Sequence, residues 1–133
     1  MKISRKYVIS AAHRLDNLSY PSKCSNVHGH NYTIEVTAEG PLNADDMVMD
    51  FTTLDHFVKP VLEPLDHADL NQVFKGIRTT CERMGLEILK NIKEEVIRHS
   101  EVLAVRLKFS LRIWESDRSF VTITEEDLVQ GSE

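Results

Sequence analysis

The sequence predicts an α+β domain in which a four-stranded antiparallel sheet carries two helices on one face. Apolar and polar residues alternate in two segments near the start of the chain and in two near its end, as in half-buried strands. Between them, apolar residues recur at the spacing of two amphipathic helices. The order is therefore strand, strand, helix, helix, strand, strand, and two hairpins separated by helices are typical of this class.

The first hairpin is predicted from residues 3–14 and 28–39. In each segment every second residue is mainly apolar, so one face of each strand is directed to the core. That face consists of Ile3, Tyr7, Ile9, Ala11 and His13 in the first strand and of His28, His30, Tyr32, Ile34, Val36 and Ala38 in the second. Residues 15–27 carry turn formers without a period and are predicted to form a loop, and Gly40-Pro41 ends the second strand.

Two helices are predicted in the middle of the chain. The first covers residues 52–62, where Pro60 predicts a short or kinked helix. The second covers residues 79–99 and begins at Thr79 or the following threonine; Thr79 and Glu82 have the spacing of a capping box. The apolar faces consist of Leu54, Phe57, Val58, Val61 and Leu62 and of Ile88, Leu89, Ile92 and Val96.

The second hairpin is predicted from residues 105–114 and 120–124, with a turn at 115–118. The apolar face of its first strand consists of Val105, Leu107, Phe109, Leu111 and Ile113. A single domain thus covers residues 1–128, and residues 129–133 are predicted to be a flexible tail. Because the long open edges of such a sheet must be covered, we expect the chain to oligomerise through them.

Composition narrows the classes of function. The 133 residues include 16 Lys and Arg against 21 Asp and Glu, and this formal charge of −5 argues against general nucleic-acid binding. An anionic ligand would need a local basic patch. Two cysteines cannot form a disulfide framework and indicate a reducing compartment. Since no apolar run approaches the roughly 20 residues of a membrane span and no apolar signal core begins the chain, we expect a cytoplasmic protein without a membrane partner.

Three of the six histidines predict a metal site. His28 and His30 are two residues apart on a strand, so their imidazoles share a face, and His13 lies on the corresponding face of the first strand. If the strands pair, the three imidazoles converge with an open fourth position, as in a catalytic zinc site, although imidazole also suits copper, nickel and iron. A single buried histidine is more often a hydrogen-bonded core residue, but burying three without a shared partner is costly. His56 and His99 lie among helical residues, where surface or structural roles are expected.

Cys24 precedes the histidine pair in the loop, beside Lys23. A nearby cation and a metal ion both lower the pKa of a thiol. Cys24 could be a fourth zinc ligand, a thiolate base facing the substrate, or an ordinary loop cysteine. Cys81 is a rival reactive thiol because it lies near a helix N-terminus, but its place in a capping segment favours a structural role.

Two further acidic sites are weaker signals by themselves. Asp66 directly precedes His67, and a carboxylate commonly fixes the tautomer of an imidazole that transfers protons. Glu115 closes an amphipathic strand, where a carboxylate can bind a guanidine-like edge through both oxygens. Without further information, a simple turn residue is the favoured interpretation.

Five motifs in order along the chain carry a resemblance to a known family. They are Ala11-Ala12-His13, Cys24-Ser25-Asn26-Val27-His28-Gly29-His30-Asn31-Tyr32, Met49-Asp50-Phe51, Leu65-Asp66-His67-Ala68-Asp69-Leu70-Asn71 and Thr80-Cys81-Glu82. From about residue 3 to 124, the chain resembles the 6-pyruvoyltetrahydropterin synthase superfamily. The short spacing from Cys24 to His28 looks most like the 6-carboxytetrahydropterin synthases of queuosine-type deazapurine biosynthesis. Positions that depart from the usual pattern are Asp46, Arg83, Trp114 and Ser116.

The resemblance implies a role for each candidate residue. His13, His28 and His30 would bind zinc; Cys24 would accept a proton; Asp66 and His67 would form the opposing acid–base relay; Glu115 would anchor the pterin and join the proton relay; and Thr80 would contact the pterin. It also implies the tunnelling fold, in which subunits form a barrel with sites at their interfaces, and suggests a hexamer of two stacked trimers.

The reaction that the resemblance implies begins with 7,8-dihydroneopterin triphosphate. Triphosphate would leave, and carbon–carbon cleavage would release acetaldehyde to give 6-carboxy-5,6,7,8-tetrahydropterin. Lys23 and Arg14 are candidate cations for the triphosphate. Two alternatives stay open: a pyruvoyl-forming synthase acting on the same substrate, and a non-catalytic zinc- or pterin-binding module in which Cys24 closes the metal shell.

Overall fold

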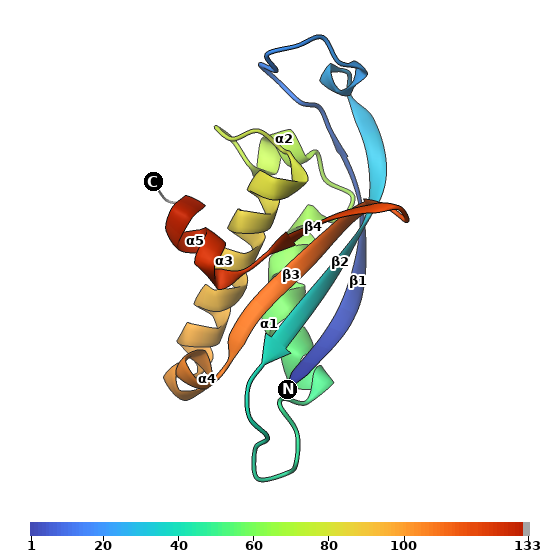
Figure 1. Cartoon of the computed structure of the whole chain (residues 1–133). Helices are drawn as coiled ribbons and strands as arrows, with labels where there is room; N and C mark the ends of the chain where they lie inside the picture. Colours follow the sequence, from blue (N-terminus) through green and yellow to red (C-terminus); the bar gives the residue numbers. More distant parts are fainter. Residues whose placement is uncertain (132–133) are drawn as a thin grey trace.

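The computed structural model describes residues 1–131 and shows one antiparallel sheet with strands in the order β1-β2-β3-β4 (Figure 1). β1 (Lys2–His13) and β2 (His28–Glu39) pair along their whole length, from Lys2 opposite Glu39 to His13 opposite His28. β3 (Lys108–Ser116) pairs with β2, and β4 (Ser119–Ile123) pairs with β3. The predicted α+β class and strand order are confirmed.

Two long helices cover one face of this sheet, α1 (Phe51–Leu62) and α3 (Cys81–His99) (Figure 1). Because side chains alternate between the two faces of a strand, every second strand residue is directed toward these helices. The core between the layers includes Ile34, Val36, Leu111 and Ile113 from the sheet and Leu54, Val58, Ile88, Leu89 and Ile92 from the helices. α1 continues through Pro60 to Leu62 and passes directly into the short 3-10 helix η2 (Glu63–Leu65).

The start of α3 differs from the prediction. Its N-cap is Thr80, whose Oγ1 accepts a hydrogen bond from the backbone N–H of Arg83 at 3.1 Å. The capping box predicted from Thr79 and Glu82 is therefore wrong. Thr79 is instead fully buried and bonded to another element, so its hydroxyl is engaged away from the helix end.

The start of β3 also differs. Residues predicted to begin the strand form a short helix, α4 (Glu101–Arg106), and Val105 is exposed rather than in the core. Ser100 caps α4 by accepting a hydrogen bond from the N–H of Leu103 at 3.1 Å, which stabilises a helical turn that alternation does not reveal. Glu115, predicted to lie in a turn, belongs to β3, at a register shift between Trp114 and Ser116.

Further short elements complete the chain. η1 (Lys23–Ser25) lies in the loop that extends beyond the helices at one end of the molecule (Figure 1), and α2 (Leu70–Val73) precedes α3. α5 (Glu125–Gly131) includes residues 129–131 of the predicted tail, and residues 132–133 lie outside the described residues. Within residues 1–131, none of the helices has the length and apolarity needed to cross a bilayer.

Candidate metal centre

The register of the first hairpin brings three histidines together. His13 lies directly opposite His28, and His30 follows two residues along β2, on the same face. Ring centroids are 4.6 Å apart for His13 and His28, 4.7 Å for His28 and His30, and 5.4 Å for His13 and His30. The convergence that strand alternation predicts is thus present in the structure.

Backbone carbonyls orient two of these rings. His13 Nδ1 lies 3.0 Å from the carbonyl oxygen and 3.1 Å from Oγ1 of Thr79, and His28 Nδ1 lies 2.7 Å from the carbonyl oxygen of Asn26. A carbonyl only accepts, so Nδ1 carries the proton in both rings and Nε2 keeps its lone pair for a ligand. This is the arrangement of a metal-binding imidazole with a hydrogen-bonded second nitrogen.

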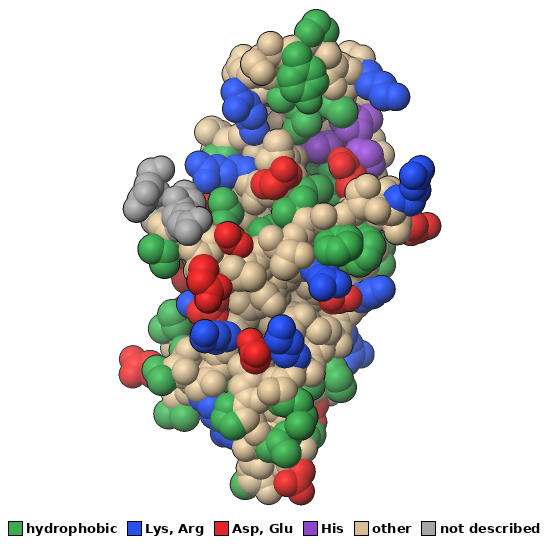
Figure 2. Space-filling model, in the orientation of Figure 1, with side chains coloured by type: hydrophobic (Ala, Val, Ile, Leu, Met, Phe, Trp, Pro, Cys, Tyr) green, Lys and Arg blue, Asp and Glu red, His purple; other side chains and the backbone are tan. Residues whose placement is uncertain are grey.

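Glu115 completes the cluster. Its Oε1 lies 3.0 Å from His30 Nε2 and 3.8 Å from His13 Nε2. One ligand atom from each of the three histidines and Glu115 fits within a 4.8 Å span, and the four residues together could hold a metal ion. Histidine side chains reach the surface beside acidic ones near the upper end of Figure 2.

Burial keeps one of these imidazoles neutral and unsatisfied. His13 is 2% exposed, and its Nε2 has no hydrogen-bond partner within the described residues. Burial lowers the pKa of His13, and the neighbouring His28 and His30 lower it further, against the Thr79 hydrogen bond and Glu115, which raise it. A buried neutral nitrogen aimed at a carboxylate and two other imidazoles fits a bound cation, because a cation supplies the missing partner.

A pocket of about 280 Å³ adjoins the cluster. Its lining includes His13, Thr80, Cys81, Glu115 and Phe120. Burial, with the nearby carboxylates of Glu115 and Glu82, raises the pKa of Cys81 to about 12. Cys81 is therefore a protonated thiol near neutral pH, which agrees with the structural role predicted for it.

Cys24 does not belong to the group of candidate metal ligands, which consists of His13, His28, His30 and Glu115. It is partly buried in η1, where its N–H donates to Ser22 Oγ at 3.1 Å and its carbonyl accepts from the N–H of Leu15 at 2.8 Å. These bonds close the base of the loop that joins the two histidine-bearing strands. Within residues 1–131 the structure brings no thiol into the ligand cluster, so it contains no closed shell of three histidines and Cys24.

The Asp66–His67 pair lies on the outer edge of β1. The N–H of His67 donates to the carbonyl of Ser10 at 2.6 Å, and the N–H of Ser10 donates to Asp66 Oδ1 at 2.9 Å. His67 Nε2 lies 3.9 Å from Asp66 Oδ2, and the His67 side chain is 82% exposed. The two side chains lie within ion-pair distance but are not hydrogen-bonded to each other, and the imidazole points to solvent. Among residues 1–131 no contact links it to the histidine cluster.

Two residues that the sequence does not assign to the site support it. Thr79 anchors His13, as described above, and its Oγ1 donates to the carbonyl of Arg14 at 3.1 Å. Asn71 accepts from the N–H of Arg14 at 2.8 Å and donates to its carbonyl at 3.0 Å, so it pairs with the chain just after β1. Asn71 belongs to a motif quoted above, whereas the capping-box spacing at Thr79 indicates a helix end and not a contact with His13.

Comparisons with known proteins agree with the fold. The profile of the family described as 6-pyruvoyl tetrahydropterin synthase matches residues 2–126. The chain is 33% identical to a 6-carboxy-5,6,7,8-tetrahydropterin synthase of Haemophilus influenzae, over 93% of this chain and 99% of that protein. It is 31% identical to a 6-pyruvoyl tetrahydrobiopterin synthase of Pongo abelii, over 94% and 92%. The solved structure of Caenorhabditis elegans 6-pyruvoyl tetrahydropterin synthase superposes with a TM-score of 0.79 at 25% identity, over 93% of this chain and 94% of that one.

Proposed function

The chain belongs to the 6-pyruvoyl tetrahydropterin synthase family, a family of lyases, and from that membership we propose a specific reaction. The proposed substrate is 7,8-dihydroneopterin triphosphate, and the proposed products are 6-carboxy-5,6,7,8-tetrahydropterin, acetaldehyde and triphosphate, with one water consumed. The observation that carries this proposal is the cluster of three convergent imidazoles, two of them oriented by backbone carbonyls, beside a pocket that the Glu115 carboxylate lines.

Zinc is the proposed metal, held by His13, His28 and His30 through their Nε2 atoms. When bound, it would supply a Lewis acid and a template for the side-chain hydroxyls of the substrate. The protein contributes the ring orientation, which the carbonyls of Thr79 and Asn26 fix before any ligand arrives.

We propose that two groups transfer protons, one on each side of the substrate. Cys24 would remove a proton from the substrate as a thiolate, and His67, held by Asp66, would donate or accept a proton on the opposite side. Glu115 would bind the guanidine-like edge of the pterin in the pocket, next to Thr80, and its contact with His30 ties it to the same proton network.

The position of His67 supports a site completed between subunits. Its exposed imidazole lies along the free edge of β1, so a second copy that covers this edge would enclose it. We propose a homo-oligomer, a hexamer of two trimers that closes into a barrel. We propose a cytoplasmic location, where Cys24 would stay reduced. If the product is 6-carboxy-5,6,7,8-tetrahydropterin, the proposed pathway is queuosine-type deazapurine biosynthesis.

Product analysis tests the proposal. Purified protein incubated with zinc and 7,8-dihydroneopterin triphosphate should release acetaldehyde and the carboxy product, identified by mass, and should carry about one zinc per chain. Release of triphosphate without acetaldehyde would instead establish the pyruvoyl-forming reaction. A relative named 6-pyruvoyl tetrahydrobiopterin synthase is 31% identical to the chain, almost as similar as the 6-carboxy-5,6,7,8-tetrahydropterin synthase at 33%. Zinc and pterin binding without any product would leave only the binding-module alternative.

A further inference from the structure

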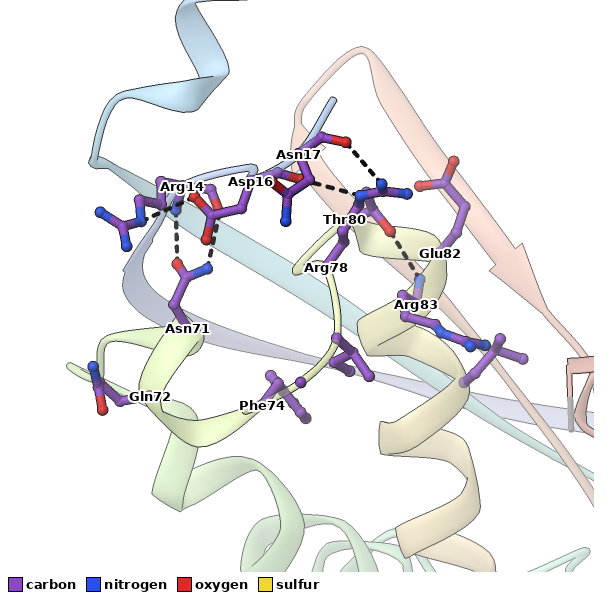
Figure 3. Close-up of a pocket in the computed structure, with 13 residues that line it drawn as sticks. Arg14, Asp16, Asn17, Asn71, Gln72, Phe74, Arg78, Thr80, Glu82 and Arg83 are labelled. Atoms are coloured by element: carbon purple, nitrogen blue, oxygen red, sulfur yellow. Dashed lines mark hydrogen bonds and ion pairs between the residues drawn. The ribbon is translucent and has the colours of Figure 1, made fainter. Parts of the chain in front are cut away.

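A second, larger pocket of about 840 Å³ lies at the amino end of α3 (Figure 3). Three arginines from separate segments line it: Arg14 directly after β1, Arg78 in the loop before α3, and Arg83 in the first turn of α3. The carboxylates that line it are Asp16 and Glu82. Three guanidinium groups in one hollow are a local basic patch on a chain whose formal charge is −5.

This arginine pocket adjoins the pocket beside the metal cluster. Thr80 and Glu82 line both. A ligand whose ring lies near Glu115 can therefore extend past Thr80 into the arginine pocket without leaving the protein surface.

Hydrogen bonds hold two of the arginines in place. Arg78 donates from Nε to the carbonyl of Asp16 at 3.1 Å and from a terminal nitrogen to the carbonyl of Asn17 at 2.7 Å (Figure 3). The backbone of Arg14 is clamped by Asn71, and its Nε lies 3.2 Å from Asp16 Oδ1. A guanidinium group has five N–H donors, so these bonds through Nε of both arginines and one terminal nitrogen of Arg78 leave donors on each group for a ligand.

We propose that the arginine pocket binds the triphosphate of the substrate, an assignment that rests on the proposed function. Guanidinium groups bind phosphate oxygens in pairs, and the N-terminus of the 19-residue helix α3 adds a favourable dipole. Arg83, one of the positions that departs from the family pattern, becomes a triphosphate-contacting residue. Lys23 does not line this pocket, so the cation beside Cys24 is not assigned to the triphosphate.

Binding of inorganic triphosphate tests the assignment without turnover. Calorimetric titration of the full chain in the presence of a chelator excludes attachment through a metal. Arg14→Gln and Arg83→Gln should each weaken binding about tenfold, the loss of one charge-assisted contact. Arg98→Gln is the matched control, because Arg98 lies at the opposite end of the same helix and pairs with Glu95; its affinity should equal that of the unmodified chain.

Thermal unfolding of each variant checks that the fold is intact, which we expect because both arginines are exposed. Unchanged affinity in Arg14→Gln and Arg83→Gln, a loss that appears only in Lys23→Gln, or equally tight binding of orthophosphate would overturn the assignment.

Kinetics separate this assignment from the proposed function. In Arg83→Gln, KM for 7,8-dihydroneopterin triphosphate should rise about tenfold, while the binding of 7,8-dihydroneopterin, which lacks the triphosphate, stays the same. A chain that binds triphosphate through these arginines but yields no pterin product would contradict the proposed reaction and leave the anion site standing. Formation of the pterin product with unchanged KM in both arginine variants would support the proposed reaction and contradict the assignment of the arginine pocket to the triphosphate.

Discussion

Individual side chains fix the orientation of the candidate metal ligands. The imidazole of His13 depends on Thr79, a residue 66 positions away, for the orientation of its ring. Glu115 is in contact with the same cluster although the family resemblance gives it a different task, the binding of the pterin. The first two predictions separate these contributions.

Replacing Thr79 with Val should weaken zinc binding about tenfold. The substitution keeps the shape of the side chain and the carbonyl but removes the hydroxyl that accepts from His13 Nδ1, and second-shell losses of this kind typically cost 10- to 100-fold in metal affinity. Competition with a chromogenic chelator measures the change. Thr122→Val, on an exposed position of β4, is the control, and equal affinities in the two variants would show that the hydroxyl plays no part.

Replacing Glu115 with Gln distinguishes a pterin anchor from a metal ligand. Three imidazoles suffice for zinc, the proposed metal, so we expect about one zinc per chain to remain. If Glu115 anchors the pterin as proposed, kcat/KM falls at least about 100-fold, because the charged bidentate contact is lost. Metal analysis and steady-state kinetics on the same sample provide both readings. Loss of zinc in proportion to activity would make Glu115 a metal ligand instead.

At the scale of elements, the packing of α3 against the sheet depends on a glycine. A methyl group at Gly85 would lie 2.0 Å from Cδ1 of Ile123 and 3.2 Å from Cδ1 of Ile113, so the helix approaches β3 and β4 closely only because this residue has no side chain. Gly85 lies within an α-helix, where alanine is ordinarily the better residue by about 1 kcal/mol. The contact with the sheet opposes that preference.

We expect Gly85→Ala to lower the free energy of unfolding by about 1–3 kcal/mol, since overpacking a buried contact outweighs the gain in helix propensity. Chemical denaturation measures the change. The matched double variant Gly85→Ala with Ile123→Val removes Cδ1 of Ile123 and should recover part of the loss, so that the two effects are not additive. Additive losses would mean that this contact does not limit the approach of α3.

Other elements depend on single hydrogen bonds that alternation cannot detect. α4 begins at a serine cap, and α5 is held by Glu125, which accepts from Lys93 Nζ at 2.6 Å and from the N–H of Phe109 at 2.5 Å. The long elements, by contrast, begin within three residues of the predicted positions, because each predicted segment carries at least four apolar residues on one face or stripe. Short segments contain too few residues to show a period.

For the whole molecule, the free edge of β1 carries Asp66 and His67 away from the metal cluster of the same chain. If the site is completed by a second copy, Cys24 and His67 of one functional site belong to different chains. Mixing two inactive variants then restores activity, as in any symmetric assembly with shared sites.

We therefore expect co-expressed Cys24→Ala and His67→Ala chains to recover about one quarter of the wild-type activity. If equal amounts of the two chains assemble at random, about one interface in four combines an intact Cys24 with an intact His67. Each variant alone should be inactive, and light scattering should show assemblies of about six times the 15.2 kDa chain mass. Mixed assemblies that stay inactive would place the whole site within one chain.

Local patterns in the chain are enough to predict the sheet, the two long helices and the convergence of His13, His28 and His30. These depend on alternation and helical period, which are local properties, and on one hairpin register. The packing of the folded chain is needed to see that Thr79 anchors His13 and that Glu115 reaches His30. It also brings Arg14, Arg78 and Arg83 into one pocket. Those contacts join residues tens of positions apart, and no periodicity in the chain encodes them: they follow from how α3 and its preceding loop pack against the end of the sheet.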